Sequence, residues 1–162
     1  PVNVVSTMSR IAERADDAFD HRGWMSELSE LRMTDTGDPD TAITDAMTQA
    51  TARAVDELGI STILCISGSG FTVRSMARFR PSARIIGLSS NERTVRQLTL
   101  SWGTEALHLP EQGDLQRRVA AALEVARDRG AVQPGELVGL LAGTDVRSRS
   151  TNVLRVERVP EA

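Results

Sequence analysis

The stretch from Ser67 to Thr72 (SGSGFT) has the residue types of a phosphate-binding turn. Gly68 and Gly70 permit a tight turn and close approach of a ligand to the backbone. The hydroxyl groups of Ser67, Ser69 and Thr72, with the first N–H groups of a following helix, suit a phosphate dianion. A glycine–serine turn that only caps the helix explains this motif, taken alone, equally well. The spacing is not that of a P-loop, and the chain has no lysine to serve one.

A second donor-rich segment runs from Gly143 to Thr151. Arg147, Ser148 and Arg149 lie at its centre among further hydroxyl-bearing residues. Arginine forks and hydroxyls bind phosphate groups, so the segment is a candidate half of a ligand site. A solvated hairpin loop is the plainer interpretation.

Two adjacent arginines, Arg117 and Arg118, stand at the start of a long helical pattern. Either side chain is long enough to reach the same ligand. Two neighbouring arginines on a helix are also common as ordinary surface residues.

The elements that position these residues alternate between strands and helices. Apolar strands are expected at 62–67, 84–88, 105–109, 136–142 and 152–159, and helices at 4–19, 39–58, 71–79, 91–100 and 114–129. Residues 21–38 contain Gly23, Gly37 and a polar run, so they are expected to form an irregular connection. This order predicts an α/β fold: a three-layer open mixed sheet, mostly parallel, with an antiparallel C-terminal strand pair.

Ligands of open α/β sheets bind at the carboxyl ends of the strands. The turn at 67–72 and the loop at 143–151 each follow such an end. We therefore expect the two segments to meet at one edge of the sheet.

Composition narrows the function. The chain has 162 residues, 40% of them hydrophobic, enough for one domain with a core. A net charge of −3 gives no basic field for nucleic acid, and no apolar run is long enough for a membrane span. Cys65 lies in an apolar run and is expected to be buried, and His21 and His108 fit neither a triad nor a metal site. A cytoplasmic protein without nucleic-acid or membrane partners is expected.

These pieces together resemble the pyruvate kinase family along nearly the whole chain. The motifs that carry the resemblance are the helical opening 1–15, the strand–turn–helix 63–81, the strand 83–88, the run 96–103, the loop 134–136 and the ending 151–156. The first residue, Pro1, then fits a chain cut from a longer protein. The resemblance implies that 1–22 is the last helix of a catalytic barrel and that 23–162 is the C-terminal regulatory domain.

In this family the C-terminal domain binds allosteric sugar phosphates. The resemblance implies that Ser67, Ser69, Gly70 and Thr72 hold one phosphate and that Arg118 holds a second. It assigns the segment at 144–150 to the effector loop. That loop lacks the tryptophan, proline and glycines usual in members that respond to fructose 1,6-bisphosphate. Glucose 6-phosphate, ribose 5-phosphate, AMP and loss of regulation therefore stay open.

The resemblance also implies what surrounds the chain. The parent enzyme transfers phosphate from phosphoenolpyruvate to ADP with Mg and K in its barrel, and it forms a homotetramer. The fragment has no catalytic residues of its own, no cofactor and no metal site. The alternative is a sugar-phosphate isomerase-type domain, which also grips phosphate with a serine–glycine turn after a strand.

Overall fold

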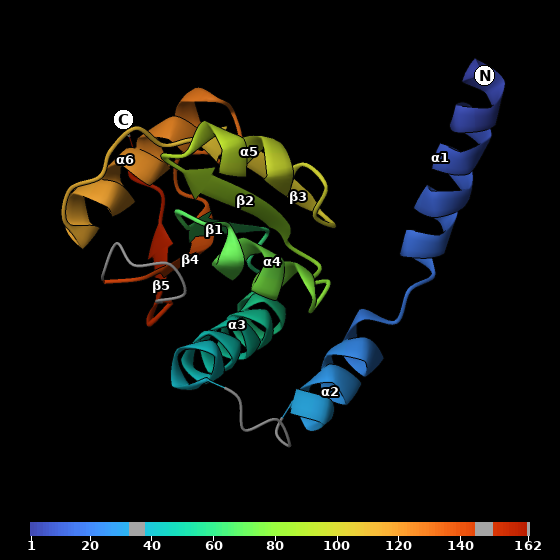
Figure 1. Cartoon of the computed structure of the whole chain (residues 1–162), viewed down its shortest axis with the longest axis horizontal. Coiled ribbons are helices and arrows are strands. Elements are labelled where there is room, and N and C mark those ends of the chain that lie inside the picture. The colour runs from blue at the N-terminus through green and yellow to red at the C-terminus, as the bar shows by residue number, and fades with distance from the viewer. Residues whose placement is uncertain (33–37, 145–150, 162) are drawn as a thin grey trace.

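The computed structural model describes residues 1–32, 38–144 and 151–161. A five-stranded sheet lies between helices on both faces, and the first helix projects away from this body (Figure 1). The helices are α1 (Val2–Asp17), α2 (His21–Arg32), α3 (Pro39–Leu58), α4 (Phe71–Ala77), α5 (Glu92–Leu98) and α6 (Leu115–Asp128). The strands are β1 (Thr62–Ile66), β2 (Arg84–Ser89), β3 (Thr104–His108), β4 (Leu137–Ala142) and β5 (Val153–Arg158).

The strand order is β3-β2-β1-β4-β5, with β1 at the centre. β1 runs parallel to both β2 and β4, so that Cys65 lies opposite Gly87 on one side and Leu141 on the other. β3 is parallel to β2, and β5 is antiparallel to β4. The predicted mixed sheet with its antiparallel last pair is confirmed.

Two apolar clusters hold the layers together, one on each face of the sheet. Because neighbouring side chains of a strand point to opposite faces, Leu64 packs toward α6 while Ile63 and Cys65 pack toward α3, α4 and α5. Every residue of β1 is buried, as expected of a central strand covered on both faces. The predicted burial of Cys65 is confirmed, and this burial raises the pKa of its thiol to about 12.

The amino-terminal edge of the sheet is fastened by Glu136. Its carboxylate accepts hydrogen bonds from Ser61 Oγ (2.6 Å), Thr62 Oγ1 (2.8 Å) and the Gln133 N–H (2.8 Å). Burial alone would raise the pKa of Glu136. The hydrogen bonds and the Arg84 guanidinium outweigh that effect and hold this pKa below its ordinary value.

Residues 21–32 form helix α2, so the expected irregular connection is wrong for this part. Asp20 caps the helix through a hydrogen bond from the Gly23 N–H to Oδ1 (2.9 Å). A Cβ on Gly23 would collide with that carboxylate, so the glycine makes room for the cap and does not break the helix. Met25 and Leu28 then pack against the core at helical spacing. The rest of the expected connection, 33–37, lies outside the described residues.

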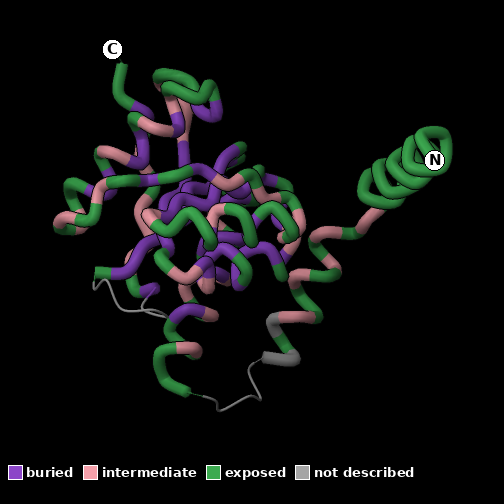
Figure 2. Tube along the Cα trace, turned by 45° about the horizontal axis from the view of Figure 1, so that its top comes forward, coloured by how far each residue is buried: buried purple, intermediate pink, exposed green. Residues whose placement is uncertain are grey.

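Helix α1 is confirmed where it was predicted, but no residue in it is buried (Figure 2). Val4, Val5, Met8 and Ile11 are each more than 60% exposed and form one apolar stripe. Such a stripe is what a helix presents to a neighbouring layer. No helix in the described ranges is long and apolar enough to cross a membrane.

Candidate functional site

The turn at 67–70 leaves the carboxyl end of β1 and leads into α4. The Ser67 N–H continues the ladder by donating to the Leu88 carbonyl at 2.9 Å. The carbonyl of Gly68 then accepts from Ser89 Oγ at 3.2 Å and from Thr94 Oγ1 at 3.0 Å. These side chains, from the end of β2 and from α5, fix the turn from beneath. The first N–H groups of α4 lack partners within the helix, as at every helix start.

Gly70 is required at the start of α4. Its backbone is left-handed, with φ +75°, a conformation that disfavours other residues. A Cβ at this position would lie 2.9 Å from Leu98 Cδ2 and 3.1 Å from Thr94 Cγ2. The close packing of α5 against the turn therefore depends on this glycine.

Thr72 joins the turn to the loop between β4 and β5. Its Oγ1 lies 2.5 Å from Thr151 Oγ1, and both residues are almost fully buried. Asn152 closes the base of the loop: Oδ1 accepts from the Thr144 N–H and Nδ2 donates to Thr144 Oγ1, both at 2.9 Å. The expected meeting of turn and loop at one sheet edge is thus observed for the described ends of the loop. Arg147, Ser148 and Arg149 lie outside the described residues.

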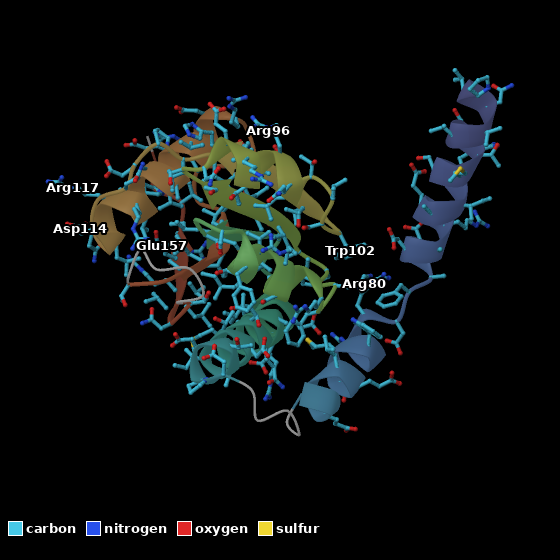
Figure 3. All side chains as sticks on the ribbon, in the orientation of Figure 1. Arg80, Arg96, Trp102, Asp114, Arg117 and Glu157 are labelled. Carbon is cyan, nitrogen blue, oxygen red and sulfur yellow. The ribbon has the colours of Figure 1, made fainter. Side chains whose placement is uncertain are left out.

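Arg118 reaches the same edge from α6. It is only 7% exposed, and its NH2 group donates to the carbonyl of Gly143 at 2.8 Å. Its Nε is buried and has no hydrogen-bond partner among the described residues. A buried guanidinium normally has its donors satisfied, so an anion at this point would complete the site. Arg117, by contrast, is exposed and points away from the body (Figure 3).

Sequence reasoning missed Ser89 and Thr94, which hold the turn from below. A usable signal existed for Ser89, because it directly follows the apolar run of the second strand. Thr94 had no such signal, since it lies inside a helix and acts only through the packing of α5. Among the described residues, no group of three or more histidine, cysteine, aspartate or glutamate side chains is arranged to hold a metal ion.

Comparison with known proteins gives a consistent result. Residues 45–157 match the family model described as "Pyruvate kinase, alpha/beta domain". The chain is 33% identical over 162 residues to a pyruvate kinase of Geobacillus stearothermophilus. This alignment covers 99% of the chain and 26% of that relative. A pyruvate kinase of Clostridium acetobutylicum is 28% identical over 98% of this chain and 32% of its own length.

Among solved structures, a pyruvate kinase from Cryptosporidium parvum superimposes with a TM-score of 0.80. The match covers 97% of this chain and 30% of that one, at 18% identity, and so concerns the fold. The chain spans about a quarter to a third of the length of the relatives it matches.

Proposed function

This chain belongs to the pyruvate kinase C-terminal α/β domain family, and from that premise we propose that it binds a phosphorylated effector of a longer pyruvate kinase. The observation that carries the proposal is the convergence of three groups at one sheet edge. They are the hydroxyl-rich turn at 67–72, the Thr151 end of the β4–β5 loop, and the buried guanidinium of Arg118.

The turn is the proposed site of the first phosphate. Ser67, Ser69 and Thr72 supply hydroxyls, and the exposed Gly68 leaves the backbone accessible, whereas the buried Gly70 holds the start of α4 against α5. A Cβ on Gly68 would meet nothing within 4 Å, so the turn is open at this residue. Arg118 Nε supplies a buried donor for a second anionic group. Arg147, Ser148 and Arg149, which lie outside the described residues, are proposed as further donors to the effector.

The donor groups of the site suit phosphate, so the proposed effector is a phosphorylated sugar or a nucleotide. Fructose 1,6-bisphosphate requires two phosphate positions, whereas glucose 6-phosphate, ribose 5-phosphate and AMP require one. Regulation further requires the effector to bind two conformations of the parent enzyme with different affinity.

The proposal extends to the parent protein. We assign it the transfer of phosphate from phosphoenolpyruvate to ADP in the cytoplasm, with Mg and K held by its catalytic barrel. Residues 1–22 are proposed as the last helix of that barrel, whose surface would cover the apolar stripe of α1. Residues 23–162 form the regulatory domain and contribute to a homotetramer. The isolated chain is expected to show no turnover in a coupled pyruvate kinase assay.

A thermal-shift screen tests effector binding. At about 100 times Kd a ligand adds about 2.7 kcal/mol of stability, which corresponds to a rise in Tm of roughly 5–11 °C for a chain of this size. One of the four effectors should give such a rise, and Ser69→Ala and Thr72→Val should abolish it. Ser82→Ala, an exposed serine away from the turn, is the matched control. No shift with any effector, or one that persists in both turn variants, would refute the proposal.

A further inference from the structure

A cleft of about 450 Å³ lies on the opposite side of α4 from the sheet, between α2 and the connection from α5 to β3. Its polar and aromatic lining consists of Trp24, Arg74, Arg78, Arg80, Ser101 and Trp102. Arg80 and Trp102 lie together at the edge of the body that faces α1 and α2 (Figure 3). We call this feature the arginine–tryptophan cleft.

The cleft carries unbalanced positive charge. Its lining includes three arginines and no acidic residue. Within the described part of the chain, no carboxylate forms an ion pair with Arg74, Arg78 or Arg80. One carboxylate contacts the lining: Asp16 accepts from the Trp102 indole N–H at 3.4 Å, while Asp20 caps α2. Guanidinium groups gathered in a concave site attract anions.

The backbone and rings around the cleft are held in place. Arg80 has φ +44°, a left-handed conformation that is unfavourable for a residue with a side chain. Its carbonyl accepts from His21 Nδ1 at 2.6 Å, and its guanidinium lies 4.7 Å from the ring centroid of Phe19 and 5.6 Å from that of Trp102. Strain maintained by such surroundings is characteristic of binding sites.

Trp24 and Arg74, which also line the cleft, are held in place by hydrogen bonds. The Trp24 indole N–H donates to the Arg78 carbonyl at 2.7 Å, and Arg74 donates to the Ser69 carbonyl at 3.1 Å. Side chains that are already ordered lose little entropy when a ligand binds. Of the three guanidinium groups in the cleft, that of Arg78 makes no hydrogen bond, ion pair or ring contact with the described residues, and it is exposed to solvent.

We propose that the arginine–tryptophan cleft binds a small planar anion, an aromatic ring that bears a phosphate or carboxylate group. The arginines match the geometry of such an acidic group, and the two indoles offer surfaces on which a ring stacks. A volume of about 450 Å³ suits a ligand of this size. The lining contains no residue of the turn at 67–72, although Arg74 contacts that turn at the Ser69 carbonyl, and the proposal does not rest on the effector function.

Intrinsic fluorescence reports on this site selectively, because Trp24 and Trp102 are the two tryptophans of the chain. The probe is phenyl phosphate, compared with inorganic phosphate, which lacks the ring, and with phenol, which lacks the charge. Phenyl phosphate should change the fluorescence saturably and bind about tenfold more tightly than either comparison compound.

Variants then locate the bound probe. Arg78→Gln should weaken phenyl phosphate about 10- to 100-fold, the value of one charge-assisted hydrogen bond. Arg93→Gln, an exposed arginine on α5, is the matched control and should leave the affinity unchanged. Thr72→Val should also leave it unchanged. A response that does not saturate, equal losses in the two arginine variants, or loss of binding in Thr72→Val would overturn the proposal.

Discussion

The left-handed backbone of Gly70 makes Gly70→Ala a sensitive test of the turn geometry. An alanine at φ +75° raises the conformational free energy of the folded chain by about 1–2 kcal/mol. Its Cβ must also displace Leu98, which is completely buried, from a separation of 2.9 Å. Forcing an extra carbon into a packed site costs about 1–3 kcal/mol. The two effects together predict a loss of about 2–5 kcal/mol, or a fall in Tm of roughly 4–20 °C.

Urea unfolding followed by circular dichroism measures this loss, and Gly59→Ala provides the matched control. Gly59 has φ +65° at the end of α3, but a Cβ there meets nothing within 4 Å. Gly59→Ala should therefore cost only the conformational part, about 1–2 kcal/mol. If Gly70→Ala destabilises the chain no more than Gly59→Ala does, the reasoning about close packing of α5 against the turn is wrong.

Three further changes test the remaining contacts. Thr151→Val leaves the buried Thr72 hydroxyl without its recorded partner and should lower the free energy of unfolding by about 1–3 kcal/mol in urea titrations, whereas Thr151→Ser should retain most of it; equal losses would count against the contact. Glu136→Gln should lower the free energy of unfolding at neutral pH. This difference in stability from wild type should vanish as the pH falls through the lowered pKa of Glu136, because the ionised carboxylate is the form that stabilises the folded chain. A stability difference that does not change with pH would contradict this. Cys65 should resist a thiol reagent at mildly alkaline pH until the chain is unfolded, because burial suppresses the thiolate, and rapid labelling of the folded chain would refute its placement.

Local patterns in the sequence were sufficient for most of the fold. Buried strands such as β1 are continuous apolar runs, and the helices predicted at 39–58 and 114–129 begin where the side chains of Asp38 and Asp114 cap them in the structure. Helix α2 was missed because Gly23 is usually read as a helix breaker. Only its position three residues after Asp20 shows that it accommodates a cap.

Contacts between distant segments were harder to predict. The strand order makes the turn at 67–72 and the loop after β4 neighbours, so their meeting followed from the expected topology. The pairing of Thr72 with Thr151 spans 79 positions and depends on the register of the sheet. The arginine–tryptophan cleft was not predicted, because Trp24 and Trp102 reach it from segments with no shared pattern.

The central claim, that the turn at 67–72 grips a phosphorylated effector, is tested most directly by the amide resonances of its glycines. Phosphate oxygens that accept hydrogen bonds from this turn must change the environment of the Gly68 and Gly70 N–H groups. A titration of the ¹⁵N-labelled chain with the effector selected by thermal shift should move these two amides saturably, with Gly59 and Gly130 unaffected. Movement that leaves Gly68 and Gly70 in place, or no movement at all, would contradict the account.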